Sequence, residues 1–169
     1  MPPCEGRACD DAVMDDIALL QRAVKLAAAA RARGDHPFGA LLVDADGGIV
    51  LEAQNTVSTD RDPTGHAETN LVRLAGRRFR PDERESMTLY TSTEPCAMCA
   101  GAIYWARIST VVFALSESDL LSITGADPEN PTLDLPCREV FARGAHPTTV
   151  RGPFAIPAAR EVHVGFWRP

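Results

Sequence analysis

Apolar residues at helical spacing form the first regular pattern along the chain. They recur at intervals of three or four from Ile17 to Val24, and an alanine-rich run continues almost to Gly34. This pattern predicts an amphipathic helix over 15–33. Residues 1–14 lack both this stripe and the apolar segment of a signal peptide, so we expect a disordered tail there.

Short apolar runs bounded by turn-forming residues predict β-strands. The first two runs flank the sequence A-D-G-G, which is typical of a β-hairpin. The later runs are separated by segments with a helical pattern, and the last run is the weakest. The strands are expected at 40–44, 49–53, 87–92, 110–115 and 148–151.

Helices are expected between the later strands. The second predicted helix covers 64–76, with Thr64 as its cap and Gly76 as its end. Pro95 suits the first turn of a third helix that runs to about Trp105, because the missing N–H has no partner to lose there. A polar loop is expected at 55–63, and shorter helical segments at 119–123, 140–144 and 158–167.

The order of these elements indicates the fold class. Strands that alternate with helices predict an α/β protein in which helices cover both faces of one sheet. The chain has 169 residues, enough for a hydrophobic core, and it shows no repeat and no linker. We therefore expect residues 15–169 to form a single domain.

Charge and cysteine content narrow the function classes. The formal net charge is −6, and the densest arginine stretch, 73–84, is interleaved with acids, whereas phosphate contacts need clustered cations. Nucleic acid is therefore a less favoured partner than a small molecule. No apolar run is long enough for a membrane span, and five cysteines without a disulfide framework favour the reducing cytoplasm.

Two of the cysteines, Cys96 and Cys99, form a C-x-x-C pair in the sequence P-C-A-M-C. Such a pair has three interpretations: a redox pair at a helix start, half of a zinc site, or two small buried side chains. A third ligand would favour zinc, because zinc in proteins takes about four ligands and a catalytic site keeps one position for water.

His66 is the candidate third ligand. A histidine at a helix start is commonly a surface or capping residue, but here both His66 and the cysteine pair begin predicted helices. Such helix starts gather at one edge of an α/β sheet, where sites form. The positive ends of the helices also favour the thiolates that a metal requires.

Glu68 lies two residues after His66 in the sequence H-A-E. Residues two apart do not share a helix face, so Glu68 is a poor candidate for a ligand of the same metal. From the first turn it could instead reach a metal-bound water and transfer a proton. Without a metal nearby, it would be an acid that complements the helix dipole.

The combination of H-A-E at 66–68 with P-C-A-M-C at 95–99 resembles the H-x-E…P-C-x-x-C signature of the zinc-dependent cytidine-deaminase-like superfamily. Further similarity extends over roughly 15–116. The segments P-F-G-A, D-P-T-G-H-A-E, T-S-T-E-P-C-A-M-C-A-G-A-I-Y-W-A-R and V-V-F-A resemble the branch that contains bacterial guanine deaminases and tRNA adenosine deaminases.

This resemblance implies a three-layer α/β/α fold around a mixed sheet of about five strands. It implies Zn²⁺ bound by His66, Cys96 and Cys99, with water as the fourth ligand. Zinc-bound hydroxide would attack the amino-bearing ring carbon, and Glu68 would carry protons to a ring nitrogen and to the departing ammonia. A homodimer is also implied, and the nearly all-apolar segment 99–106 agrees with burial of both sides of that helix.

The resemblance further implies contacts to the substrate. Asn55 and the backbone of Ala67 would hold the base, and Phe38 and Trp105 are candidate pocket walls. Without the surrounding motif, Asn55 would be interpreted as a turn residue and the two aromatic residues as core.

After residue 115 the sequence departs from the branch. An F-D-D stretch, whose acid reads the purine in guanine deaminases, is missing, and the candidates for that acidic role are Asp119, Asp127, Glu129 and Asp134. The terminal G-F-W, with Phe166 and Trp167, is similar to the aromatic tail that closes over the pocket in guanine deaminases.

We therefore expect a zinc-dependent hydrolytic deaminase of a free nucleobase or nucleoside, with guanine as the leading candidate. The alternative is a tRNA-specific adenosine deaminase. A non-catalytic zinc module would have no use for Glu68 and would usually supply a fourth protein ligand. A thiol oxidoreductase would leave His66 and Glu68 unexplained.

Overall fold

The computed structural model describes residues 7–125 and 127–167, with side chains from position 16 onward. Helix α1 (Arg7–Arg33) begins before the expected position 15. Residues 7–14 contain no proline or glycine that would stop a helix. The first six residues of the expected tail lie outside the described part.

One mixed sheet of five strands forms the centre of the molecule, with the order β2-β1-β3-β4-β5. β1 pairs antiparallel with both β2 and β3, whereas β4 runs parallel to β3 and to β5. The expected mixed sheet is thus confirmed. The strands are β1 (Gly39–Val43), β2 (Ile49–Gln54), β3 (Thr88–Thr93), β4 (Thr110–Leu115) and β5 (Thr149–Arg151).

Seven further helices occupy the described residues after α1. Two of them, α2 and α4, are single turns that the sequence pattern did not indicate. The helices are α2 (Val57–Asp60), α3 (Ala67–Arg78), α4 (Pro81–Arg84), α5 (Ala97–Trp105), α6 (Glu117–Thr124), α7 (Cys137–Ala142) and α8 (Pro157–Glu161).

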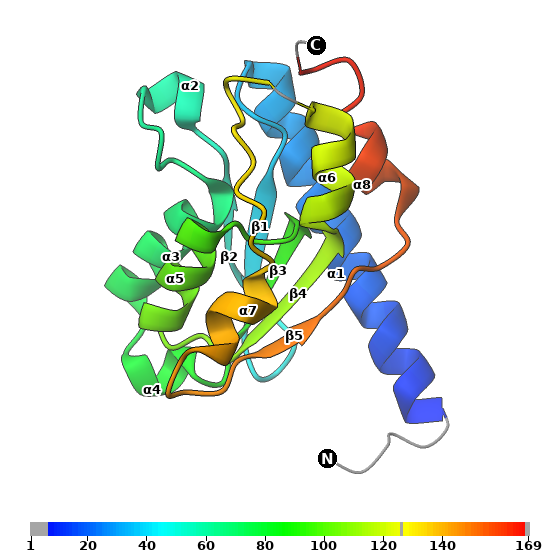
Figure 1. Ribbon diagram of the computed structural model, residues 1–169. Coiled ribbons are helices and arrows are strands. Elements are labelled where there is room, and N and C mark those ends of the chain that lie inside the picture. The colour runs from blue at the N-terminus through cyan, green and yellow to red at the C-terminus, as the bar shows by residue number, and fades with distance from the viewer. Residues whose placement is uncertain (1–6, 126, 168–169) are drawn as a thin grey trace.

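Helices cover both faces of the sheet, as Figure 1 shows, with α3 and α5 on one face and α1 and α8 on the other. Successive strand residues point to opposite faces. Leu42 accordingly packs in the cluster that includes Leu71 of α3, while Leu41 packs with Leu20 of α1. This is the expected three-layer α/β/α arrangement.

The ends of α3 differ from the prediction. The residue before its first turn is His66, while the Thr64 hydroxyl donates to Asp62 Oδ1 at 2.6 Å and caps no helix. Gly76 lies inside the helix, where a Cβ would meet no atom within 4 Å. The helix continues to Arg78 because Gly76 keeps helical backbone angles and forms no left-handed end.

The predicted terminal helix over 158–167 is shorter in the structure. α8 ends at Glu161, and the chain then continues in turns to Phe166. Gly165 has a φ of +72°, a left-handed conformation that ends regular helix. None of the helices in the two described ranges is long and apolar enough to cross a bilayer.

The topology places several helix starts at one sheet edge. Because β3 and β4 are parallel, the helices that follow them, α5 and α6, begin at the same edge. The amide of Thr56, just after β2, donates to Gly65 O at 2.8 Å, which brings the start of α3 to this edge as well. A side chain at Gly65 would come within 2.9 Å of Thr56 Oγ1, so this approach requires glycine.

Candidate active site

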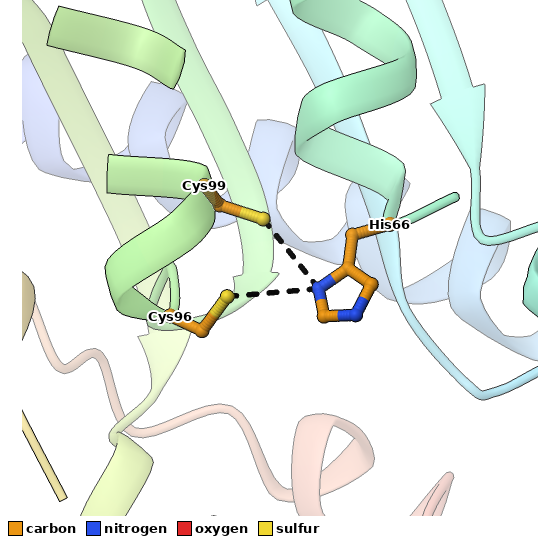
Figure 2. A group of neighbouring side chains, drawn as sticks. All are labelled: His66, Cys96 and Cys99. Carbon is orange, nitrogen blue, oxygen red and sulfur yellow. Dashed lines mark hydrogen bonds between the residues drawn. The ribbon is translucent and has the colours of Figure 1, made fainter. Parts of the chain in front are cut away.

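Three potential metal ligands converge at this sheet edge. The Sγ atoms of Cys96 and Cys99 lie 3.6 Å and 3.5 Å from Nδ1 of His66, and all three ligand atoms lie within 4.8 Å of one another. Figure 2 shows the three side chains pointing toward one common point from the starts of α3 and α5. The structure thus brings together the three ligands expected from the sequence.

The helix starts determine these side-chain directions. His66 and Cys96 both occupy the residue before the first helical turn, with extended backbone angles, and neither side chain makes a capping hydrogen bond. Each is therefore free to point across the gap between α3 and α5. Cys99 follows one turn later on α5 and is fully buried.

The two thiols and the imidazole have mutually shifted pKa values. The hydrogen bond from Cys99 lowers the pKa of Cys96 to about 4, and the same contact together with burial raises the pKa of Cys99. Burial lowers the pKa of His66, but its hydrogen bond with Cys96 and the charge of Glu68 outweigh burial and raise it. Cys99 and His66 therefore hold protons that a bound cation would displace, whereas Cys96 is already a thiolate at neutral pH.

Glu68 lies in the first turn of α3, and its side chain points into the protein. Its Oε1 accepts a hydrogen bond from Thr91 Oγ1 at 2.8 Å, and its Oε2 lies 3.5 Å from Cys99 Sγ. Burial raises the pKa of Glu68. A buried carboxyl with a raised pKa beside a cluster of potential metal ligands is suited to accept and return a proton.

A small cavity of about 30 Å³ opens beside this cluster. Its walls come from both sides of the sheet edge and from the segment between α6 and α7. The residues that line it are Phe38, His66, Glu68, Glu94, Cys96, Glu117, Leu120 and Asn130.

The expected acidic residues do not line this cavity. Asp119 is exposed and accepts a hydrogen bond from Ser116, Asp134 is exposed, and the Glu129 carboxylate lies 3.9 Å from His36 Nε2. Asp127 is buried, but it accepts from the Glu129 amide. The acid that lines the cavity after residue 115 is instead Glu117, and Asn130 accompanies it.

Position alone could have indicated Glu117. It directly follows a strand and opens a helix, which is also the position of the cysteine pair. The sheet-edge reasoning that selected His66 therefore applies to it equally. For Asn130 the sequence holds no comparable signal, because it lies in the irregular segment between α6 and α7.

Asn55 carries an unsatisfied buried donor. Its side chain is fully buried, and Oδ1 accepts from the Val57 amide at 3.0 Å. Among the contacts of the described residues, Nδ2 has no hydrogen-bond partner. Most buried polar groups are paired, so an unpaired one is a candidate for contact with a bound molecule.

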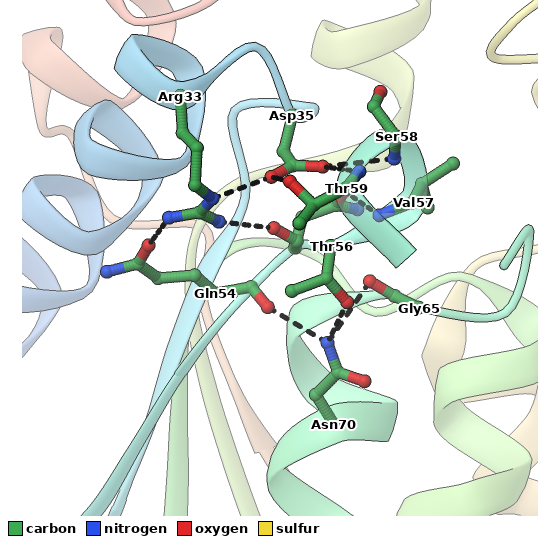
Figure 3. Close-up of polar contacts among 10 residues, drawn as sticks. Arg33, Asp35, Gln54, Thr56, Val57, Ser58, Thr59, Gly65 and Asn70 are labelled. Atoms are coloured by element: carbon green, nitrogen blue, oxygen red, sulfur yellow. Dashed lines mark hydrogen bonds and ion pairs between the residues drawn. The ribbon is translucent and has the colours of Figure 1, made fainter. Parts of the chain in front are cut away.

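A polar network fixes the segment around Asn55 (Figure 3). Arg33, at the end of α1, donates to Asn55 O at 2.9 Å and to Asp35 Oδ2 at 2.8 Å. Asp35 in turn accepts from the backbone amides of Ser58 and Thr59. Hydrogen bonds of Arg33 and Asp35 therefore tie the segment that carries Asn55 to the end of α1.

Asn70 holds the same segment from the direction of α3. Its Nδ2 donates to Gln54 O at 3.0 Å, to Thr56 Oγ1 at 2.9 Å and to Gly65 O at 3.2 Å. One amide group thus joins the residues on both sides of Asn55 to the residue before His66. The hydrogen bonds of Asn70 therefore position both the segment with the unpaired Asn55 donor and the start of α3, which carries His66.

The terminal aromatic residues pack beside the cavity. The ring of Trp167 lies 6.0 Å from that of Phe38, which lines the cavity, and 5.0 Å from that of His36. Trp167 Nε1 also donates to His163 Nδ1 at 3.2 Å. Phe38 therefore lines the cavity, and the terminal segment packs against it.

The structure does not support Trp105 as a pocket wall within one chain. Trp105 is the last residue of α5, at the opposite end from Cys96, and it is 81% exposed. A helix of this length separates its two ends by more than one turn. Ala67, by contrast, is the first residue of α3 and is fully buried beside the ligands.

The site combines a buried glutamate with a histidine and two cysteines, and these residues lie on helices that begin at one edge of a mixed sheet. This combination is typical of hydrolytic deaminases with a zinc-binding region. The family model described as "Cytidine and deoxycytidylate deaminase zinc-binding region" matches residues 13–115. The chain belongs to this family, and it is a deaminase.

Its relatives differ in the substrate that their names give. The chain is 42% identical to "Probable cytosine deaminase" of Schizosaccharomyces pombe over 90% of this chain and 92% of that protein. It is 45% identical to "Guanine deaminase" of Bacillus subtilis over 63% and 68% of the two chains. A tRNA-specific adenosine deaminase of Haemophilus influenzae is 39% identical over 60% of this chain and 59% of its own length.

A solved structure gives the same fold. The structure of guanine deaminase from Nitrosomonas europaea superimposes with a TM-score of 0.71 and 26% identity, covering 88% of this chain and 82% of its own. The similarity includes the region after residue 115, where the family model ends.

Proposed function

We propose that this protein is a zinc-dependent deaminase that hydrolyses a free nucleobase or nucleoside, with guanine as the first candidate, and releases ammonia. The observation that carries the proposal is the cavity in which Glu68, His66 and Cys96 meet beneath Phe38. A reacting ring that widens and enters this cavity would touch the proton-carrying carboxyl and the potential metal ligands at once.

The donor set fits zinc. Two sulfurs and one imidazole nitrogen at converging positions supply three of the four ligands of a catalytic zinc site, which leaves one position for water. Two thiolates and a neutral imidazole also balance the charge of the dication. Zinc, when bound, supplies the Lewis acidity that activates water at neutral pH.

Proton transfer is then the task of the protein's own residues. Glu68 would accept one proton from the attacking water and pass it to a ring nitrogen, and then accept a second proton from the new hydroxyl group and pass it to the leaving amino group, which departs as ammonia. Its bond from Thr91 holds one carboxyl oxygen, so the other oxygen is directed toward Cys99 and the ligand cluster. We expect the Asn55 side-chain amide and the backbone amide of Ala67 to hold the base; the unpaired Nδ2 donor of Asn55 supports its part in this.

Three features favour a small substrate over tRNA. The cavity is small, the terminal segment with Trp167 covers its wall, and the net charge is −6. A protein that binds an RNA stem would neutralise several phosphates with clustered cations.

Cytosine is a second candidate base. The relative named as a probable cytosine deaminase matches nearly the whole length of this chain, including the segment after residue 115. Guanine is supported by the solved structure that covers the same segment.

A substrate panel tests the proposal. The zinc-loaded protein is incubated with guanine, guanosine, cytosine, cytidine, adenine and an anticodon stem-loop, at low and moderate salt, and ammonia release is measured. We expect turnover of a free base with little salt dependence. Deamination of the stem-loop alone, falling steeply with salt, would replace this proposal with the tRNA alternative.

We also propose that the protein works in the cytoplasm as a homodimer. Cys137 is a buried free thiol, and the ligand cysteines must stay reduced to bind a metal. The exposed apolar end of α5 at Trp105 is a candidate contact surface between two chains.

A further inference from the structure

Glu94 is a buried acid that lies directly before the ligand pair. It precedes Pro95 and Cys96, its exposed fraction is 7%, and it lines the cavity. Its backbone amide donates to Leu115 O at 2.7 Å, and this bond fixes it to the end of β4. The proposed chemistry assigns Glu94 no task.

The side chain of Glu94 binds the two ends of one long segment. Its Oε2 accepts from the amide of Glu117, the first residue of α6, at 3.0 Å. Its Oε1 accepts from the amide of Cys137, the first residue of α7, also at 3.0 Å. A carboxylate can accept with both of its oxygens, whereas a glutamine would turn an N–H group toward one of these two donors.

The segment between these two bonds forms part of the cavity wall. Three of the residues that line the cavity belong to it: Glu117, Leu120 and Asn130. The amide of Asn130 donates to Asp127 O, a bond that shapes the segment from within. The two bonds to Glu94, in contrast, join the segment to the residues that carry Cys96.

The size of the cavity makes the position of this wall important. A volume of about 30 Å³ holds little more than a water molecule, so a base enters only when part of the wall moves. Protein interiors are close-packed, and a small shift of one wall therefore changes what the cavity can hold. How tightly a base binds should accordingly depend on where the segment from Glu117 to Cys137 lies.

We propose that Glu94 is a positioning residue for substrate binding. By holding the amides of Glu117 and Cys137, it sets the distance between the ligand pair and the segment that completes the cavity. It acts through these two bonds, and proton transfer stays with Glu68. This inference rests on the proposed function and adds a residue that controls how tightly the site holds its base.

Two variants of Glu94 separate its position from its charge. Glu94→Gln keeps the length of the side chain but loses one acceptor together with the charge. Glu94→Asp keeps the charge and both acceptors but withdraws them by one methylene group. Tyr90→Phe is the matched control, because it removes a different buried hydrogen bond from β3, the one that the Tyr90 hydroxyl donates to Asp16 Oδ1 at 2.7 Å.

Steady-state kinetics of the zinc-loaded proteins test the inference, with the free base that the wild-type protein deaminates as substrate. We expect both Glu94 variants to raise KM about tenfold, as for the loss of a buried hydrogen bond. The value of kcat should change much less, and the zinc content should stay the same. A higher KM with kcat retained indicates lost substrate binding. Tyr90→Phe should keep the wild-type KM even if its Tm falls.

Amide hydrogen exchange follows the two bonds without any turnover. Peptides that contain the amides of Glu117 and Cys137 should exchange faster in both Glu94 variants than in the wild-type protein or in Tyr90→Phe. Unchanged exchange in these peptides would show that Glu94 does not hold the segment, and it would overturn the inference.

The kinetic results can overturn the inference in three further ways. An unchanged KM in both Glu94 variants would leave Glu94 with a structural role only. A wild-type KM in Glu94→Asp alone would assign the effect to charge. Loss of zinc, or a fall in kcat as large as the rise in KM, would assign Glu94 to the reactive centre.

Folding and the proposed function are separated from this inference by the same set of proteins. If Glu94→Gln does not fold, Glu94→Asp decides by the same criteria, and failure of both to fold would assign Glu94 to the fold. If the wild-type protein deaminates a free base and the Glu94 variants keep its KM, this inference alone fails. If the wild-type protein deaminates no free base, the proposed function fails and this inference falls with it.

Discussion

Three glutamates surround one cavity, and their hydrogen bonds distinguish their tasks. Glu94 gives both carboxyl oxygens to backbone amides, Glu68 gives one to Thr91, and Glu117 gives none within the described structure. The chemistry available to a carboxyl group depends on its remaining acceptor capacity. Glu68 retains one oxygen for proton transfer, and Glu117 lines the cavity with both oxygens unbonded in the described part of the chain.

Replacement of Glu68 by glutamine should abolish proton transfer while preserving shape. We expect kcat to fall about 10²-fold or more, the usual contribution of a general acid–base group. The zinc content should stay unchanged, as measured by elemental analysis of the same preparation. Loss of zinc in Glu68→Gln would mean that Glu68 is a ligand.

The ligand cluster predicts one zinc ion per chain. Elemental analysis of the purified protein should show this ratio, and treatment with a chelator should remove both the metal and the activity. Because His66, Cys96 and Cys99 join α3 to α5, the chelated protein should also melt at a lower temperature. Full activity in a metal-free preparation would contradict the zinc assignment.

The residues that carry the chemistry could be selected from the sequence, and the residues that shape the cavity could not. His66, Glu68, Cys96 and Cys99 have fixed spacings within helix starts, and short-range geometry brings their side chains together. The cavity walls depend on long-range packing instead. Trp105 is an example, since the motif contains it but the far end of α5 carries it to the surface of its own chain.

Among the elements, the strands followed their apolar pattern closely, whereas the helix ends did not. The start of α3 is set by the hydrogen bond between Gly65 and Thr56, just after β2, and not by a capping hydroxyl. The single turns α2 and α4 lie in polar sequence and have no buried residue, so hydrophobic periodicity cannot indicate them.

Asn70 should act as a positioning residue through the segment between β2 and α3. Asn70→Ala removes the donors to Gln54, Thr56 and Gly65. We expect KM to rise about tenfold, as for the loss of one or two buried hydrogen bonds, with kcat changed less. Arg77→Ala, an exposed change on the same helix, serves as the control. An unchanged KM would exclude this positioning role.

The terminal segment should make stability depend on pH. Burial, with a smaller effect of Arg31, lowers the pKa of His163 from 6.5 to about 4. Between these values the unfolded chain binds a proton that the folded protein does not, so stability falls as the pH falls. At pH 5 this loss is about 2 kcal/mol relative to neutral pH.

Urea unfolding of wild type and His163→Phe at pH 7.5 and pH 5.0 checks this prediction. The variant lacks the titrating ring, so its loss of stability on acidification should be smaller than that of wild type by the stated amount. An identical pH dependence in both proteins would contradict it.

At the scale of the whole molecule, exposed apolar residues on α3 and α5 predict a dimer. Trp105 is 81% exposed, Leu74 41% and Met98 39%. Light scattering at micromolar concentration should report two chains, and Trp105→Arg should shift the protein toward the monomer. Leu121→Arg, on α6, should not. A wild-type monomer would contradict the prediction.

The carboxyl group of Glu94 holds the backbone amides of Glu117 and Cys137, which lie at the two ends of one long surface segment. We therefore expect the segment between these two anchors to accept insertions and replacements without movement of the ligand cluster. Asn130, which lines the cavity, belongs to this segment. Grafting the corresponding segment of a relative onto this chain is thus a direct way to transfer base preference while the catalytic machinery is retained.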